Sequence, residues 1–304
     1  MIILYHNVFP DLEYQKRKES RIAISRTAFE QQILWLREWF QIVTLKEYVQ
    51  RTYAEPGSLR NTISITFDDG IKSTFENVYP FLSAHKIPST MFVTTAHLDA
   101  CDLLHFTYFY VLCYESEYTS INIHNESYSL LSVSQRARAC YAVHSAALDS
   151  GDPLRFAKEL QQIYPIPEDC TSLYAGMGSR QIRQAAREGL MEIGAHTVYH
   201  PYLSQLKSSD QLMEITRCKD TLEGLCEKPI SFFAYPSGDY NEITLQLVEA
   251  AKFEAACAVI PKRLGNKVHF ELERIGIYSP SLLKLQLKLI AHFLKLRELG
   301  WKFG

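Results

Sequence analysis

The 304-residue sequence has no excess of charge of either sign. Lys and Arg total 32, Asp and Glu total 34, and the formal net charge is −2. Proteins that bind nucleic acid through its phosphates concentrate basic residues, so we expect no nucleic-acid partner. Hydrophobic residues make up 47% of the chain, which is ordinary for a globular protein of this length with a sizeable core.

The cysteines form no CxxC pair and their number is odd. There are seven: Cys101, Cys113, Cys140, Cys170, Cys218, Cys226 and Cys257. The spacing therefore predicts neither a disulfide framework nor a CxxC metal or redox motif. We expect reduced thiols in the cytosol, several of them in the core.

Segments that would direct the chain into or across a membrane are also missing. No run approaches the ~18 apolar residues of a membrane span. The segment Met1–His6 has neither the basic region nor the long apolar stretch of a signal peptide. From these two absences we expect a cytoplasmic protein.

Short apolar segments alternate with amphipathic ones, a pattern that is typical of an α/β domain. The strands that we expect are Ile2–Tyr5, Thr62–Phe67, Ser89–Val93, Glu192–Ala195, Ser231–Tyr235, Ala255–Ile260 and Glu273–Tyr278. Between about 98 and 178 the strand pattern fades, and we predict a mostly helical insertion with a short hairpin near 121–130. Long insertions of this kind usually lie over a site and shape substrate choice. We treat 1–304 as one domain.

A long helix is expected at the end of this pattern, over about 282–299. Leucines, Phe293 and Trp301 interleave there with Lys284, Lys288 and Lys295. A basic amphipathic helix with a Trp can lie on an anionic membrane surface, which would give peripheral contact with the inner membrane face. The other interpretation is a helix that closes the domain.

Two adjacent carboxylates follow a predicted strand. Asp68 and Asp69 come directly after Phe67, and Gly70 allows the chain to turn away sharply. Neighbouring carboxylates compete for protons, but both can stay ionised when one of them binds a cation. The alternative is that one of them only caps the following helix.

Two histidines end another predicted strand. His196 and His200 are four residues apart, so both imidazoles can face one point if the chain between them turns helically. Together with Asp69 they would supply two nitrogens and one carboxylate to a metal, with positions left open for water and substrate. The alternative is two unrelated histidines.

These motifs occur in a specific order. ITFDDG, then GAHTVYH, then FAYPSGDYN resemble the polysaccharide deacetylase family, also called the NodB-like domain or carbohydrate esterase family 4. The opening ILYHNV is similar to one branch of that family, and the likeness spans roughly 1–97 and 179–280. The resemblance implies a distorted (β/α) barrel, a divalent metal that is usually zinc, and removal of an acetyl group from a carbohydrate.

The resemblance also implies roles for individual residues. Asp68 would be the general base, and Asp69, His196 and His200 would hold the metal. The segment Tyr235–Gly238 matches the motif whose backbone helps to form the oxyanion hole, so Tyr235, Pro236 and Gly238 are candidate substrate contacts.

The sequence departs from the family pattern at two places. Many members have an Arg two positions before the motif's Pro, where this chain has Ala234. Arg274 is a plausible substitute that would orient the base, although a structural salt bridge is an equal alternative. The usual late His has no clean match, and His6 is our candidate for the general acid.

Other protein classes fit less well. A catalytically impaired carbohydrate-binding or scaffold protein on the same fold is the main alternative, and it would bind no stoichiometric metal. A non-haem iron oxygenase also uses two histidines and a carboxylate, but the chain has no HxD motif. A glycosidase needs opposed carboxylates, whereas neighbours on a strand point to opposite faces.

The substrate that we expect is an N-acetylhexosamine-containing carbohydrate. An N-acetyl group is preferred to an O-acetyl group. Because no export signal is expected, a precursor in surface polysaccharide or glycolipid biosynthesis fits better than finished cell-wall polymer. The sequence indicates no oligomeric state.

Overall fold

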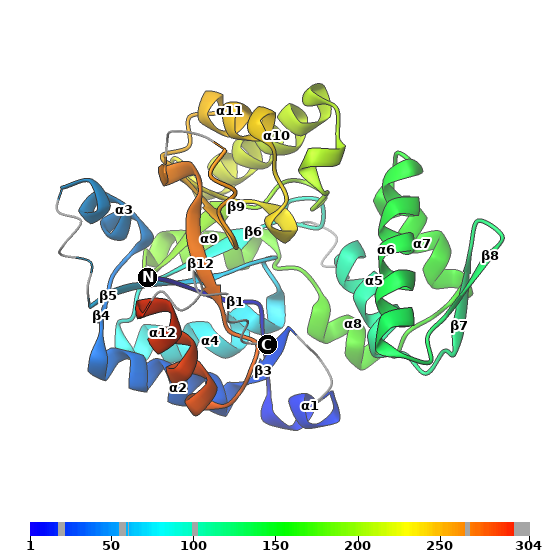
Figure 1. Ribbon diagram of the computed structural model, residues 1–304, viewed down its shortest axis with the longest axis horizontal. Coiled ribbons are helices and arrows are strands. Elements are labelled where there is room, and N and C mark those ends of the chain that lie inside the picture. Colours follow the sequence, from blue (N-terminus) through cyan, green and yellow to red (C-terminus); the bar gives the residue numbers. More distant parts are fainter. Residues whose placement is uncertain (18–21, 55–58, 60, 99–102, 265–267, 295–304) are drawn as a thin grey trace.

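Seven parallel strands close into a barrel in the computed structural model, which describes residues 1–17, 22–54, 59, 61–98, 103–264 and 268–294 (Figure 1). The order is β1-β12-β11-β10-β9-β6-β5, and β5 pairs with β1 to close the ring. Their bounds are Ile2–Tyr5 (β1), Thr62–Phe67 (β5), Ser89–Val93 (β6), Met191–Ala195 (β9), Phe232–Ala234 (β10), Ala255–Ala258 (β11) and Leu272–Gly276 (β12). A short strand, β4 (Gln41–Ile42), extends the sheet beyond β5. The expected (β/α) barrel is confirmed.

The register of the barrel brings the carboxyl ends of several strands to one level. Tyr5 pairs with Phe67, and Val93 pairs with Ala195. Side chains alternate along β5 because the strand has a period of two: Ile63, Ile65 and Phe67 join the main core. Thr62, Ser64, Thr66 and Asp68 therefore share the other face, so the residue after the strand continues a buried polar row.

Helices surround the barrel, and most of them bury apolar side chains against it, whereas the short first helix has no buried residue. They are α1 (Asp11–Lys16), α2 (Arg26–Trp39), α3 (Leu45–Ala54), α4 (Lys72–His85), α9 (Ser179–Glu188), α10 (Ser208–Cys226), α11 (Glu242–Ala250) and α12 (Leu282–Phe293). In α2 the apolar spacing buries Phe29, Ile33 and Leu36, and the Ser25 side chain caps the helix by accepting a hydrogen bond from the N–H of Ala28. Two further strands, β2 (Asn7–Phe9) and β3 (Ala23–Ser25), pair beside this barrel.

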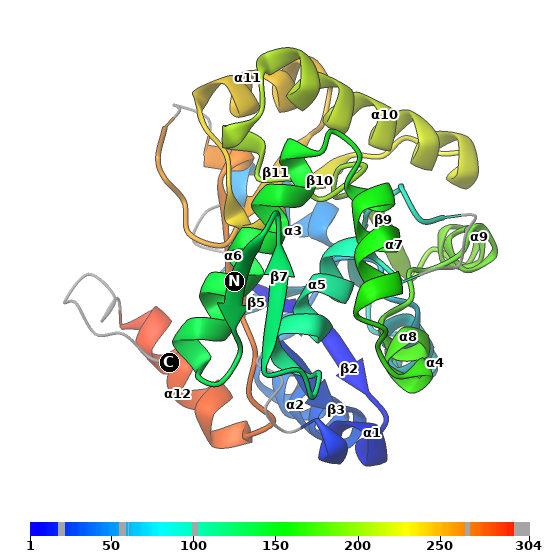
Figure 2. The ribbon, with the colours of Figure 1, turned by 90° about the vertical axis from the view of Figure 1, so that its right-hand side faces the viewer.

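The insertion forms a second layer beside the barrel, and Figure 2 views the molecule from that side. Its elements are α5 (His105–Tyr114), β7 (Ser120–Ile123), β8 (Glu126–Ser129), α6 (Val133–Asp149), α7 (Pro153–Ile163) and α8 (Glu168–Tyr174). They share a separate apolar core that includes Phe109, Leu112 and Val143. The N–H of Met177 donates to the carbonyl of Gly70 at 2.7 Å, so the insertion is attached next to the carboxylate pair.

Two expectations about the end of the chain need adjustment. The strand predicted to reach Tyr278 ends at Gly276. The Tyr278 side chain turns back over Gly276, where a Cβ would clash with its ring. Helix α12 is described to Phe293, and the remainder of the predicted helix lies outside the described residues. Within the part of the chain that the structure describes, no helix has the length and apolar character needed to cross a membrane.

Candidate active site

The two adjacent carboxylates lie in a sharp turn at the end of β5. Asp69 and Gly70 both have left-handed backbone, with φ of 72° and 69°. A Cβ on Gly70 would also lie 2.9 Å from the Val93 side chain, so a glycine is required for both reasons. The turn directs Asp68 and Asp69 into the same cavity while both stay nearly buried, at 3% and 6% exposure.

Arg274 reaches Asp68 across the barrel from β12. Its two terminal nitrogens donate to the two carboxylate oxygens, Nη1 to Oδ1 at 2.6 Å and Nη2 to Oδ2 at 2.7 Å. Burial alone would raise the pKa of Asp68, but the Arg274 guanidinium together with His196 and His6 outweighs burial, and the pKa lies below its usual value. Asp68 is therefore an oriented carboxylate at neutral pH.

The two histidines converge on Asp69 from the loop after β9. Nε2 of His196 and Nε2 of His200 each lie 3.5 Å from Oδ1 of Asp69. Thr197 shapes the turn between them, since its hydroxyl oxygen accepts a hydrogen bond from the N–H of His200 at 3.0 Å. Glu214 of α10 holds the same loop, because one of its oxygens accepts from the N–H groups of Val198 and Tyr199, each at 2.9 Å.

The donor set fits a divalent metal. One ligand atom from each of Asp69, His196 and His200 lies within 4.8 Å of the others. Nδ1 of His196 donates to the carbonyl of Ala234 at 2.8 Å, which leaves Nε2 as the ring atom that faces Asp69. Burial lowers the pKa of His200 to about 3, so its imidazole is neutral and has a lone pair to offer.

His6 lines the same cavity from the end of β1. Within the described chain, its buried Nδ1 has no hydrogen-bond partner. The ring lies 5.6 Å from the Tyr278 ring, between centroids. The site thus contains a third imidazole with one uncommitted nitrogen, which agrees with the position predicted for His6 but does not test its role.

The segment from Tyr235 to Gly238 borders the cavity next to the histidines. The N–H of Tyr235 donates to Cys257 and the N–H of Gly238 donates back to Tyr235, so both are committed to backbone carbonyls. Between them, Ser237 has left-handed backbone with φ of 54° and lines the cavity. Pro236 starts the 3₁₀ turn without lining the cavity. Ser237 is the residue of this motif that the sequence reasoning passed over.

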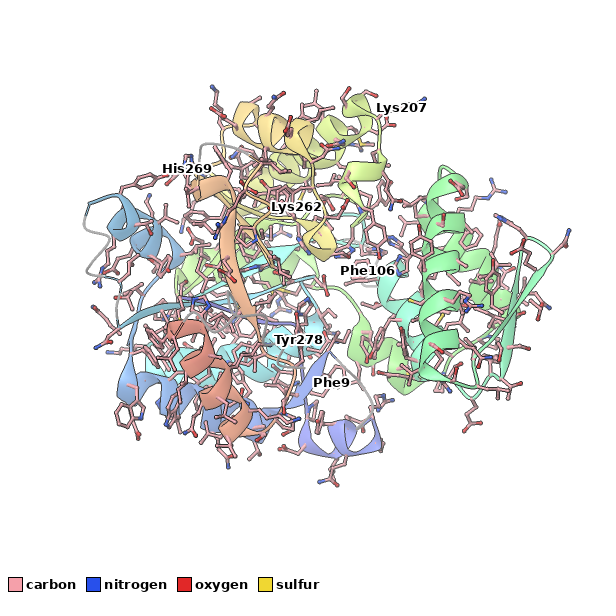
Figure 3. The ribbon with its side chains drawn as sticks, in the orientation of Figure 1. Phe9, Phe106, Lys207, Lys262, His269 and Tyr278 are labelled. Carbon is pink, nitrogen blue, oxygen red and sulfur yellow. The ribbon has the colours of Figure 1, made fainter. Side chains whose placement is uncertain are left out.

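The cavity has a volume of about 600 Å³ and takes one wall from the insertion. Phe106 and Tyr110 come from α5, and Cys140 and His144 from α6. The Phe106 ring stacks on His200, with centroids 4.1 Å apart and planes 19° apart. In Figure 3, Phe106 lies on the barrel-facing side of the insertion, with Lys262 and Tyr278 on the barrel. None of these residues could be assigned to the site from the sequence.

Comparison with known proteins agrees with this geometry. The family model described as "Polysaccharide deacetylase" matches residues 57–150 and 155–256, more than half of the chain. This chain belongs to the polysaccharide deacetylase family. The matched residues include Asp68, Asp69, His196, His200 and the Tyr235–Gly238 segment.

Curated members of the family match over a shorter stretch. A Staphylococcus aureus (strain MSSA476) protein named poly-beta-1,6-N-acetyl-D-glucosamine N-deacetylase is 37% identical over 78 residues, which are 25% of this chain and 26% of that protein. A Staphylococcus epidermidis protein of the same name is 30% identical over 96 residues, 31% of this chain and 32% of that protein. These alignments thus span about a quarter to a third of the relatives' length.

Two solved structures share the fold over nearly the whole chain. The Streptococcus pyogenes deacetylase PplD in complex with acetate covers 94% of this chain, and 96% of that chain is matched, at 18% identity and a TM-score of 0.59. IcaB from Ammonifex degensii has 96% coverage of both chains, 19% identity and a TM-score of 0.60. At these identities the likeness establishes the fold alone.

Proposed function

We propose that this polysaccharide deacetylase family member is a metal-dependent hydrolase that removes an N-acetyl group from a carbohydrate. The observation that carries the proposal is the convergence of Asp69, His196 and His200 beside the Asp68–Arg274 pair in one cavity. The names of the curated relatives support an amide rather than an ester as the bond that is broken. An O-acetyl esterase is the less favoured form of the same chemistry.

Asp68 acts as the general base in this proposal. Its carboxylate is ionised and held by Arg274, so it can accept a proton from the attacking water without first losing its own. Asp69, His196 and His200 would hold a divalent metal, which we propose to be zinc because two imidazoles and a carboxylate with open positions are typical of catalytic zinc. When bound, the metal would acidify water and polarise the acetyl carbonyl.

Two further groups complete the proposed chemistry. We assign to the N–H of Ser237 the role of donating to the carbonyl oxygen as negative charge develops, because Ser237 lines the cavity and the N–H groups of Tyr235 and Gly238 bond backbone carbonyls. His6 would donate a proton to the departing amine, since its ring borders the cavity and its Nδ1 has no partner among the described residues. Tyr235, Pro236 and Gly238 then shape the turn that presents Ser237.

The proposed substrate is a carbohydrate that contains N-acetylhexosamine, in the synthesis of a surface polysaccharide or glycolipid. The relatives' printed name specifies β-1,6-linked N-acetylglucosamine, and this linkage is our first choice. A catalytically impaired scaffold on the same fold loses its main support, because Arg274 supplies the guanidinium that position 234 lacks.

Acetate release tests the proposal. Purified protein loaded with Zn²⁺ would be incubated with β-1,6-linked N-acetylglucosamine oligomers and, separately, with O-acetylated sugars. We expect acetate from the amide, loss of acetate release in Asp68→Asn, and about one zinc per chain in wild type but not in a His196→Ala, His200→Ala double variant. Activity that survives Asp68→Asn would refute the assigned base. A wild-type protein that retains no metal and releases no acetate would favour the scaffold.

We also propose peripheral membrane contact through α12. Leu283, Leu287, Ile290 and Leu294 recur every three or four residues on one face and are 47–63% exposed, while Leu285 and Leu289 are buried. Trp39, which is 64% exposed, lies on the neighbouring α2, whose end contacts α12 through the Phe40–Phe293 stack. An apolar face with an exposed Trp and flanking lysines is typical of helices that bind anionic membrane surfaces.

Co-sedimentation with vesicles tests this contact. We expect binding to anionic vesicles that falls in Ile290→Glu and with rising salt. Val133→Glu should change nothing, because Val133 is 52% exposed, as Ile290 is at 51%, but lies in the insertion. Equal binding by the two variants would exclude α12 as the contact. The expected cytoplasmic location is part of the same proposal, and cell fractionation tests it.

A further inference from the structure

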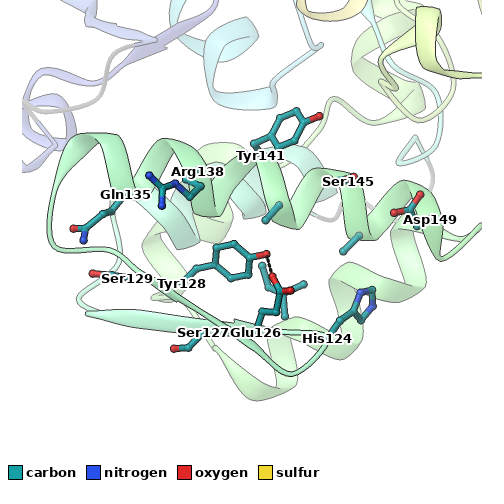
Figure 4. A pocket seen from close by; sticks show the side chains of 13 residues that line it. His124, Glu126, Ser127, Tyr128, Ser129, Gln135, Arg138, Tyr141, Ser145 and Asp149 are labelled. Atoms are coloured by element: carbon teal, nitrogen blue, oxygen red, sulfur yellow. Dashed lines mark hydrogen bonds between the residues drawn. The ribbon is translucent and has the colours of Figure 1, made fainter.

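A second cavity lies in the insertion, on the far side of α6 from the proposed catalytic pocket. It has a volume of about 800 Å³ and lies between α6 and the β7–β8 hairpin (Figure 4). Its walls carry two tyrosines, Tyr128 and Tyr141, together with the hydrogen-bonding side chains of Gln135, Arg138 and Asp149. This cavity is larger than the pocket that contains the metal-ligand candidates, yet the proposed chemistry does not use it.

The lining has the composition of a carbohydrate site. Aromatic rings offer flat apolar faces to the C–H side of a sugar, and guanidinium, amide and carboxylate groups match its hydroxyls. The side chain of Tyr141 is 61% exposed, so its ring is available to a ligand. Among the described residues no carboxylate lies within ion-pair distance of Arg138, which leaves its donors for a ligand. Tyr128 is oriented by its hydrogen bond to Glu126 at 2.6 Å.

Helix α6 connects this cavity to the catalytic pocket. Cys140 and His144 line the catalytic pocket, whereas Gln135, Arg138 and Tyr141 line the second cavity. A glycan that occupied both cavities would have to pass around α6, whose diameter with side chains is roughly 10–12 Å. Such a path needs a chain of several sugar rings, because a single ring is too short.

We propose that the cavity between α6 and the hairpin is a distal binding site for the same glycan chain whose N-acetyl group enters the catalytic pocket. The proposal rests on the proposed deacetylase function for the identity of the glycan. A substrate that reaches both sites must be a polymer or a long oligomer, and it binds the protein at a second point on the other side of α6. Tyr141 is then a specificity-determining residue that acts on chain length and not on the chemical step.

The test compares kcat/KM for β-1,6-linked N-acetylglucosamine oligomers from dimer to hexamer and longer. We expect kcat/KM of the wild type to rise with chain length. Tyr141→Ala and Arg138→Ala should each lower kcat/KM on the long oligomers by roughly tenfold, as loss of an aromatic or Arg contact at a binding site does, and leave the dimer unchanged. Tyr53→Ala is the matched control, because Tyr53 is also 61% exposed but lies on α3.

Calorimetric binding of the hexamer separates failure of this site from failure of the proposed function. If the wild type deacetylates the oligomers but both variants match it at every length, the distal site is overturned and the deacetylase stands. If the wild type releases no acetate but binds the hexamer, and Tyr141→Ala weakens that binding while Tyr53→Ala does not, the distal site stands and the activity is overturned. If the wild type neither releases acetate nor binds the hexamer, both the distal site and the deacetylase function are overturned.

Discussion

Arg274 holds both carboxylate oxygens of Asp68, at 2.6 and 2.7 Å, from a strand more than two hundred residues further along the chain. The guanidinium is 1% exposed and its Cζ lies 5.4 Å from the centroid of the Phe92 ring. A buried ion pair with two parallel hydrogen bonds orients its carboxylate more strictly than a single contact does. The proposed base therefore depends on Arg274 for its orientation, and Arg274 is the main group that favours its charged form.

Replacing Arg274 should lower activity more than it perturbs substrate binding. We expect Arg274→Lys to reduce kcat by about 10²-fold or more, because an ammonium cannot make both parallel bonds. Arg274→Ala should also destabilise the fold by roughly 3–5 kcal/mol, since it leaves Asp68 buried without its partner. Steady-state kinetics and chemical denaturation measure the two effects. An unchanged kcat in Arg274→Lys would show that the ion pair has only a structural role. Arg26→Lys, on the exposed surface, serves as the control.

Phe106 links the insertion to the metal-ligand candidates by stacking on His200. Shortening this side chain in Phe106→Ala should let the imidazole move and weaken zinc retention by about tenfold, as the loss of groups that orient a ligand does. Competition with a chelator of known affinity measures the change. Phe156→Ala, in the same insertion but outside the catalytic pocket, should retain zinc like the wild type; equal losses in both variants would point to unfolding of the insertion.

Packing explains why a glycine, Gly194, stands at the start of the GAH motif. A Cβ on Gly194 would lie 2.5 Å from Cδ1 of Phe92 and 3.2 Å from the carbonyl oxygen of Phe232. Gly194→Ala should therefore destabilise the protein by about 1–3 kcal/mol through overpacking. Thermal or chemical denaturation checks this, and the double variant Gly194→Ala, Phe92→Leu should recover part of the loss. A single variant as stable as the wild type would mean that the strand shifts without cost.

The sequence pattern was sufficient for an α/β domain and for the carboxylate and histidine motifs, and the family resemblance of those motifs implied the barrel. Each motif follows a strand whose apolar pattern is local, and parallel strands place such ends at one rim. The contribution of the insertion could not be predicted in the same way. Helix α5 reads HFTYFYVLCY and is apolar on all sides, so its pattern does not indicate that Phe106 faces His200. That contact depends on how two separate cores pack together, which no local period encodes.

Glu192 should make stability depend on pH. Burial raises its pKa to about 7 from the usual 4.5, and its carboxylate lies next to the hydroxyl of Thr90 on β6. Between about pH 4.5 and 7 the folded state then holds more protons than the unfolded state, so stability falls as pH rises through that window. Glu192→Gln removes the free-energy cost of ionising a buried carboxyl at this position.

The variant should match the wild type near pH 5 and exceed its free energy of unfolding by on the order of 2 kcal/mol near pH 8. Urea denaturation at the two pH values measures the difference, with Glu159→Gln on the exposed face of α7 as the control. If the free energy of unfolding changes between pH 5 and pH 8 by the same amount in the wild type, Glu192→Gln and Glu159→Gln, Glu192 is ionised in the folded protein at little cost. Its carboxylate would then be paired in solution, most directly with Lys46, whose charge already lowers its pKa.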